Sequence, residues 1–144
     1  MERAFMLARE AARAGEVPVG AVVIDPATGA IVGEGGNLVE STNDPSAHAE
    51  IVAIRAACAA IGMPRLDGFD LYVTLEPCAM CAQAIAHARL RRLYFGAYDP
   101  KGGGVEHGAR VFDRATCHHR PEVCGGIREG EAADLLRDFF SERR

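Results

Sequence analysis

Residues 16–39 read EVPVGAVVIDPATGAIVGEGGNLV and carry the clearest local fold signal in the chain. Val17–Ile24 is rich in β-branched residues and almost wholly apolar, which favours a buried strand. Asp25–Gly29 has the composition of a turn, and Ala30–Val39 has the pattern of a returning strand. The segment therefore predicts a β-hairpin.

Helical and strand patterns alternate on both sides of this hairpin. Apolar residues recur at helical spacing in residues 2–14, and Asn43–Ser46 offers capping residues before a second helical pattern. The predicted helices span residues 2–14, 47–61, 78–88 and 131–140, and the predicted strands span residues 17–24, 30–39, 69–75, 93–97 and 110–112. This order predicts a mixed sheet covered by helices, that is, a three-layer α/β domain.

The composition is that of a globular protein. The chain of 144 residues is 49% apolar and 25% charged, and no linker, repeat or low-complexity stretch interrupts it, so we expect residues 1–144 to form one domain. A net charge of −4 argues against a generally basic nucleic-acid-binding protein, although a local arginine patch that contacts RNA is compatible with it. Without a membrane-spanning apolar run or a signal peptide, the sequence predicts a soluble cytoplasmic protein that does not contact membranes.

The five cysteines, at positions 58, 78, 81, 117 and 124, are an odd number and fit a disulfide framework poorly. A chain of this size with an adequate core is expected to keep its thiols reduced. Cys78 and Cys81 lie three residues apart on a predicted helix, so both sulfurs can reach one metal ion, although a redox pair has the same spacing. Cys58 is most simply a small core residue.

The stretch His48-Ala49-Glu50 supplies an imidazole and a carboxylate, which a redox pair of cysteines does not need. A lone histidine at a helix start more often caps or packs, so the prediction depends on the two stretches together. One imidazole (His48) and two thiolates (Cys78 and Cys81) are three ligands for tetrahedral Zn²⁺, which leaves a fourth position for water and indicates catalysis. Glu50, two residues after His48, points to a different side and is predicted to shuttle protons between this water and the substrate.

His-x-Glu followed by Pro-Cys-x-x-Cys resembles the zinc-dependent cytidine and nucleobase deaminase superfamily. The resemblance implies a cytidine-deaminase-like α/β/α fold with a five-stranded mixed sheet and helices on both faces. It also implies one Zn²⁺ per subunit and the hydrolytic removal of an exocyclic amine.

Further stretches resemble the bacterial tRNA-specific adenosine deaminases within that superfamily. They run through nearly the whole chain and comprise Glu16–Val22, Asn37, Asp44-Pro45, Leu71–Cys78, Phe95–Ala97, Asp99–Gly102, His118-His119 and Leu135–Phe140. This resemblance implies conversion of adenosine to inosine at the wobble position of an arginine tRNA. It implies the tRNA anticodon stem-loop as a partner and a homodimer as the oligomeric state.

The same resemblance implies contacts with the substrate. Asn37 would hydrogen-bond the flipped base, Asp99 would lie near the sugar of the target nucleotide, and Phe139 and Phe140 would belong to the surface that meets the anticodon loop. Each has a local alternative, because Asn37 and Asp99 also suit turns and the phenylalanines also suit a helix core. Candidates for phosphate contacts, which ordinary solvated side chains explain equally well, are Arg89, Arg91, Arg92, Lys101, Arg143 and Arg144.

Two features depart from the resemblance. His107 lies in a loop where a small hydroxyl residue is expected, and it is predicted to alter the rim of the pocket. Cys117 and Cys124, with His118-His119 between them, superficially suggest a second metal site, but their spacing matches no common zinc pattern.

Two other functions stay open at this point. A deaminase of free guanine or another small nucleobase shares the metal motif. A non-catalytic zinc or RNA-binding domain would close the coordination with a fourth thiol, such as Cys58 or Cys117.

Overall fold

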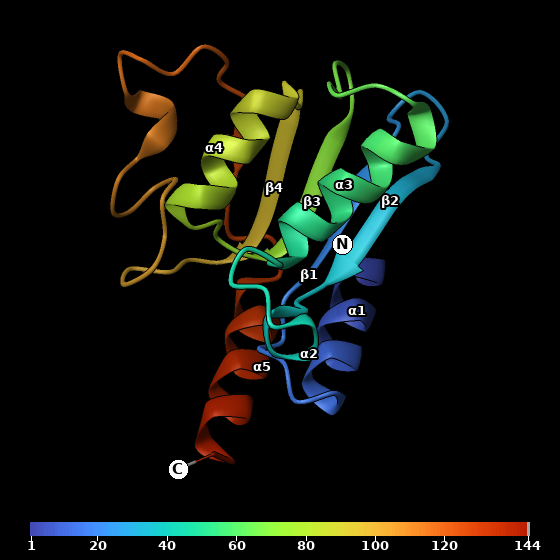
Figure 1. Ribbon diagram of the computed structural model, residues 1–144. Coiled ribbons are helices and arrows are strands. Elements are labelled where there is room, and N and C mark those ends of the chain that lie inside the picture. Colours follow the sequence, from blue (N-terminus) through green and yellow to red (C-terminus); the bar gives the residue numbers. More distant parts are fainter. Residues whose placement is uncertain (144) are drawn as a thin grey trace.

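The computed structural model describes residues 1–143 and shows a five-stranded sheet between two layers of helices (Figure 1). The strands are β1 (Gly20–Ile24), β2 (Ile31–Gly36), β3 (Asp70–Leu75), β4 (Arg92–Ala97) and β5 (Glu122–Cys124). The helices are α1 (Glu2–Arg13), α2 (Val39–Thr42), α3 (Ala49–Ile61), α4 (Ala79–Ala88) and α5 (Glu129–Ser141), with one 3₁₀ turn, η1 (Val111–Asp113). The predicted α/β/α fold with a five-stranded mixed sheet is confirmed.

The strand order is β2-β1-β3-β4-β5. Strand β1 pairs antiparallel with β2 and with β3, whereas β3, β4 and β5 are parallel to one another. Because β3 and β4 are parallel, their carboxyl ends lie at the same edge of the sheet. The segments that begin at Glu76 and Tyr98 therefore leave the sheet side by side.

The main core lies between the sheet and the pair α3 and α4. Small residues of α3 and α4 pack there against the larger apolar residues of β1, β3 and β4, including Leu71, Val73, Leu93 and Phe95. On the opposite face, Phe5 of α1 and Ala132 of α5 form a smaller cluster with Ala97. Among residues 1–143, no helix combines the length and the apolar character that a membrane span requires.

The glycines of the predicted hairpin allow the helices to approach the sheet closely. A Cβ atom on Gly33 of β2 would lie 2.5 Å from the carbonyl oxygen of Ala53 and 2.5 Å from the amide nitrogen of Ala57, both in α3. Gly20 of β1 is restricted in the same way by the backbone of Ala4 and Ala8 in α1. The backbone of α3 therefore packs directly on β2, and this contact fixes the distance of α3 from the sheet. The first turn of α3 enters the functional site.

Two predicted strands need correction. Residues 110–112 form no strand but enter the 3₁₀ turn η1, because Val111 and Phe112 are buried against α4 rather than paired in the sheet. The fifth strand is instead β5, which pairs with Arg92–Tyr94. The strand predicted over residues 30–39 ends at Gly36, and the short helix α2 follows it.

Candidate metal centre and substrate cavity

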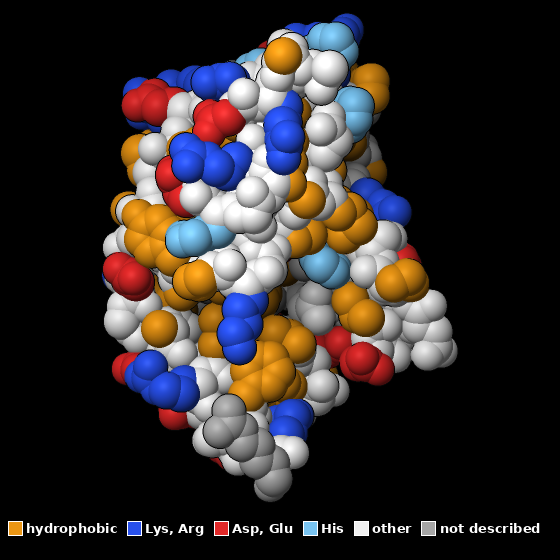
Figure 2. Space-filling view, turned by 90° about the vertical axis from the view of Figure 1, so that its left-hand side faces the viewer, with side chains coloured by type: hydrophobic (Ala, Val, Ile, Leu, Met, Phe, Trp, Pro, Cys, Tyr) orange, Lys and Arg blue, Asp and Glu red, His pale blue; other side chains and the backbone are white. Residues whose placement is uncertain are grey.

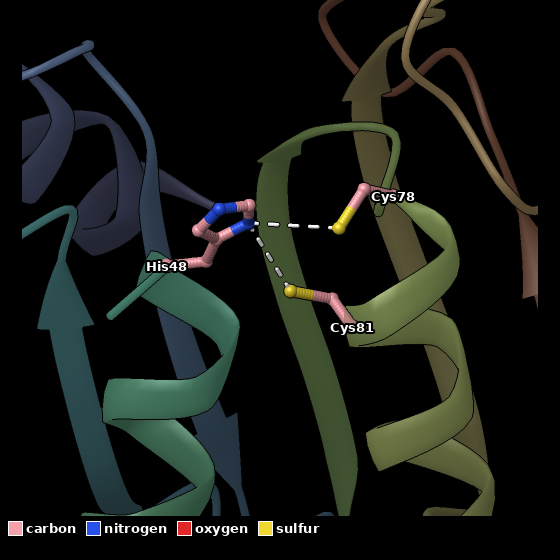
Figure 3. Close-up of side chains that lie close together, drawn as sticks. All are labelled: His48, Cys78 and Cys81. Atoms are coloured by element: carbon pink, nitrogen blue, oxygen red, sulfur yellow. Dashed lines mark hydrogen bonds between the residues drawn. The ribbon is translucent and has the colours of Figure 1, made fainter. Parts of the chain in front are cut away.

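Three side chains from two helix starts converge at the carboxyl edge of β3. His48 precedes α3 and Cys78 precedes α4, both with extended backbone, and Cys81 lies in the first turn of α4. The Nδ1 atom of His48 lies 3.6 Å from the Sγ atom of Cys78 and 3.5 Å from that of Cys81 (Figure 3). The predicted metal ligands are therefore brought together.

These distances fit tetrahedral zinc. Bonds of about 2.1 Å to nitrogen and 2.3 Å to sulfur, at a tetrahedral angle, separate the two ligand atoms by about 3.6 Å. In the described part of the chain, His48, Cys78 and Cys81 are the one group of three or more potential ligands close enough to hold an ion. Neither Cys58 nor Cys117 belongs to this group, so three potential protein ligands are brought together here.

The second metal site suggested near Cys117 is not formed by the described residues. The Cys117 thiol donates to the carbonyl oxygen of His119, and the ring of His119 contacts the carbonyl oxygen of Leu90. These side chains serve the local loop structure.

The surroundings of this group favour a negative charge on one of its two sulfurs, that of Cys78. A hydrogen bond from the Cys81 thiol lowers the pKa of Cys78 to about 4 against the opposing effect of burial, and a smaller contribution from His48 also lowers it. The hydrogen bond to Cys78, together with burial, raises the pKa of Cys81, and the hydrogen bond to Cys78 raises the pKa of His48. A thiolate is the form of cysteine that binds a metal ion, so Cys78 is the cysteine of this group that already favours that form.

Glu50 lies in the first turn of α3, next to the metal ligands, and is 4% exposed. Burial raises the pKa of its carboxyl group above the ordinary value of 4.5. A carboxyl group whose pKa is raised by burial holds a proton more readily than an exposed one, a property that suits the predicted shuttle.

A cavity of about 830 Å³ opens beside the metal ligands, and its size lies in the range of small-molecule sites. The surface is hollowed on the face shown in Figure 2, with apolar and histidine side chains around the hollow. The lining comes from six segments: Gly15, Val17 and Val19; Asn37, Val39 and Glu40; His48 and Glu50; Leu75, Glu76 and Cys78; Asp99 and Gly102; Phe139 and Arg143.

Of the four side chains that the resemblance placed near the substrate, three line this cavity. They are Asn37, Asp99 and Phe139. Phe140 is 46% exposed and is not part of the lining, although its ring packs edge-on against Phe139 at a centroid distance of 5.3 Å. Asp99 also has a local role, because its Oδ1 atom accepts hydrogen bonds from the backbone of Lys101 and Gly102.

The candidate phosphate-binding cations differ in their surroundings. Arg91 makes two hydrogen bonds to Asp70, and Arg92 makes one to Glu122, so both charges are paired within the protein. Arg143 lines the cavity, and its guanidinium group lies 3.4 Å from the centre of the Phe139 ring. Arg144 lies outside the described residues.

Two buried carboxylates beside the cavity were not singled out from the sequence. Glu16 accepts hydrogen bonds from the backbone of Glu40 and Ser41 and from the Ser41 hydroxyl, and it thereby caps α2. Glu76 is bonded in a similar way to the loop after β4. In the sequence, each of these glutamates is visible only as a charged residue next to an apolar strand pattern. This pattern does not show which groups the carboxylate binds.

Comparisons with known proteins agree with this geometry. The family described as "Cytidine and deoxycytidylate deaminase zinc-binding region" matches residues 1–97. The tRNA-specific adenosine deaminase of Agrobacterium fabrum is 55% identical over 144 residues, which cover 100% of this chain and 93% of that protein.

Two solved structures show the range of similarity. One, from work described as "Biochemical and Structural Studies of A-to-I Editing by tRNA:A34 Deaminases at the Wobble Position of Transfer RNA", has a TM-score of 0.91 and 54% identity, and the match covers 94% of this chain and 97% of that one. The guanine deaminase of Bacillus subtilis has a TM-score of 0.67 and 34% identity, with 99% and 90% covered.

Proposed function

Because the chain belongs to the cytidine and deoxycytidylate deaminase zinc-binding family, we propose that it is a zinc-dependent enzyme that deaminates adenosine to inosine at the wobble position of a tRNA anticodon loop. One observation carries this proposal. Three potential metal ligands, His48, Cys78 and Cys81, lie together beside Glu50, at the wall of a cavity. The choice of tRNA over guanine is supported by the identity of 55% with a tRNA-specific relative, against 34% with a guanine deaminase.

In this proposal, His48, Cys78 and Cys81 hold one Zn²⁺ per subunit. Zinc bound by three protein ligands supplies a Lewis acid that activates water near neutral pH. Glu50 moves the protons: its carboxylate accepts one from the attacking water and delivers it to a ring nitrogen of the base. It then accepts the second proton of that water from the new hydroxyl group on the attacked carbon and donates it to the departing amine. Adenosine and water thus give inosine and ammonia, and Glu50 returns to its starting state.

The side chains that line the cavity support the proposal that a nucleoside unit enters it. The polar side chains of Asn37, Glu40 and Asp99 suit the edges of a base and a sugar, and Phe139 offers a ring. Among the described residues that line the cavity, Arg143 is the one arginine, and none is a lysine. With so few cationic side chains inside, we expect the phosphates of an RNA chain to stay at the cavity mouth. We assign the hydrogen bond to the base to Asn37 and the sugar contact to Asp99. We place Phe140, which is exposed beside Phe139, on the surface that meets the anticodon loop.

Several wider assignments belong to the same proposal. The substrate is an arginine tRNA bound through its anticodon stem-loop, and the active form is a homodimer. Residues 1–144 act as one catalytic domain, in the cytoplasm where tRNA is modified. A single-stranded loop is a suitable substrate because its bases can be flipped out at low cost.

The test compares substrates and one isosteric variant. Purified zinc-loaded protein is assayed for inosine in an arginine tRNA anticodon stem-loop, and in parallel for turnover of guanine and cytidine. We expect inosine formation and no turnover of the free compounds. Turnover of guanine alone would overturn the assignment of the substrate, and no turnover of any of the three would overturn the assignment as an enzyme.

The variant Glu50→Gln removes the proton shuttle but keeps the shape of the side chain. We expect it to retain one zinc ion by elemental analysis and to bind the stem-loop as before, with kcat lowered by about 10²- to 10⁴-fold. Glu142→Gln, an exposed carboxylate just after α5, is the matched control and should leave kcat unchanged. Full activity of Glu50→Gln would remove Glu50 from the mechanism.

A further inference from the structure

Glu76 directly follows β3 and is a buried carboxylate that the proposed chemistry does not use. Its side chain has no exposed surface, and its backbone N–H donates to the carbonyl oxygen of Ala97, so its position is set by the pairing of β3 with β4. It lies two residues before the metal ligand Cys78 and in the wall of the cavity.

Both carboxylate oxygens of Glu76 are occupied by one segment, residues 98–107, which we call the rim loop. Oε1 accepts from the backbone N–H of Asp99 at 3.0 Å and lies 2.8 Å from Nδ1 of His107. Oε2 accepts from three successive backbone N–H groups, those of Val105, Glu106 and His107, at 3.3, 3.0 and 3.0 Å. One carboxylate therefore ties together the beginning and the end of the rim loop.

Successive backbone N–H groups that point at one site form an anion-binding nest, and hydrogen bonds to a carboxylate are stronger than those to a neutral acceptor. Because these donors already occupy both oxygens of Glu76, its carboxylate is not available to take a proton from substrate or water. This distinguishes Glu76 from Glu50.

The rim loop is also packed tightly between Glu76 and α4. A Cβ atom on Gly103 would lie 2.5 Å from the carbonyl oxygen of Asp99, and the Gly104 amide donates to the carbonyl oxygen of Pro77 at 2.8 Å. Asp99 and Gly102, which belong to this loop, line the cavity. The position of this part of the cavity wall thus depends on Glu76.

We propose that Glu76 is a positioning residue that holds the rim loop in the conformation that binds the substrate, and that His107 is part of the same anchor. This inference rests on the proposed deaminase function and deepens it. His107, which stands where the resemblance led us to expect a small hydroxyl residue, adds a side-chain contact to its own backbone contact.

The main test is Glu76→Gln in the zinc-loaded protein. A glutamine has one acceptor oxygen, and its NH₂ group would face N–H donors, so part of the rim loop loses its partner. We expect hydrogen exchange of the Val105–His107 amides to become at least 10-fold faster, while exchange in α1 and the zinc content stay at the wild-type values. On the stem-loop we expect KM to rise at least 10-fold and kcat to change less than 3-fold.

A second pair of variants keeps the test decisive if Glu76→Gln does not fold. His107→Ala removes one donor and should raise KM about 2- to 5-fold, whereas His107→Asn keeps a side-chain N–H donor and should restore much of the wild-type value. Equal KM values for the two His107 variants would argue against the anchor.

The outcomes separate this inference from the proposed function. Wild-type exchange rates in the Val105–His107 amides of Glu76→Gln would overturn the positioning role, whatever the activity. A loss of kcat with unchanged KM would also overturn it, because Glu76 would then act in the chemical step. If the wild-type protein deaminates no stem-loop, the proposed function fails, while the exchange measurement still tests the anchor.

Discussion

The contact between Gly33 of β2 and helix α3 gives a prediction that links packing to the metal centre. Replacing Gly33 with alanine adds one methyl group at the place where backbone meets backbone. That methyl carbon would lie 2.5 Å from both the Ala53 oxygen and the Ala57 nitrogen. Neither backbone atom can rotate away as the end of a flexible side chain would.

The size of the effect follows from this geometry. Ordinary contacts of carbon begin near 3.5 Å, so α3 or β2 must shift by about 1 Å. Overpacking of this kind costs about 1–3 kcal/mol, which lowers the melting temperature of a protein of this size by roughly 2–12 °C. His48 directly precedes α3, and a shift of about 1 Å exceeds the roughly 0.2 Å that metal–ligand distances tolerate. We therefore expect Gly33→Ala to bind zinc more weakly as well as to unfold earlier.

Gly130→Ala is the matched control, because a Cβ atom on this α5 residue meets nothing within 4 Å. It should raise stability slightly, by up to about 1 kcal/mol, as alanine does in a helix. Both variants are compared by thermal unfolding of the zinc-free protein and by competition for zinc with a chelator. A Gly33→Ala variant with wild-type melting temperature and zinc affinity would refute the reasoning.

Two further predictions concern the metal and the pH dependence of stability. Cys81→Ser should lose zinc in elemental analysis, whereas Cys58→Ser should retain it, since only Cys81 belongs to the ligand group. Burial acts to raise the pKa of Glu16, but its hydrogen bonds from Glu40 and Ser41 outweigh this and hold the pKa below 4.5. The stability that this carboxylate supplies is present above pH 4.5 and is lost as the pH falls through the lowered pKa. Glu16→Gln should therefore melt below the wild type at pH 7, by a difference that shrinks in acid; an equal difference at pH 7 and pH 3 would contradict this.

The sequence pointed to the three side chains that the fold brings together, because part of their arrangement is local. Cys78 and Cys81 are one helical turn apart, and His48 lies at the start of another helix. The sequence does not state that these two helix starts meet at one edge of the sheet. That meeting depends on the parallel pairing of β3 with β4 and on the packing of α3 against β2, which are contacts between distant parts of the chain.

The errors in the predicted strands also arise from contacts between distant parts of the chain. Val111 and Phe112 are apolar because they pack beside α4, not because they pair in a sheet, so their composition suggested a strand that does not exist. Strand β5 has three residues, and its place depends on pairing with β4 and on the hydrogen bond between Arg92 and Glu122. A segment this short shows no alternation from which a strand could be predicted.

Glu16 and Glu76 show a further limit, since their partners are mainly backbone N–H groups, which every residue except proline carries. They also change how the net charge of −4 bears on an RNA substrate. The carboxylates of Glu16, Glu76 and Asp99, all beside the cavity, are turned toward backbone N–H donors of the protein itself. Part of their charge is therefore balanced locally, and a phosphate chain at the cavity mouth meets less repulsion than the count of acidic residues suggests. Glu16, Glu76 and Asp99 thus hold parts of the cavity wall in place, and a negative net charge is compatible with the proposed RNA substrate.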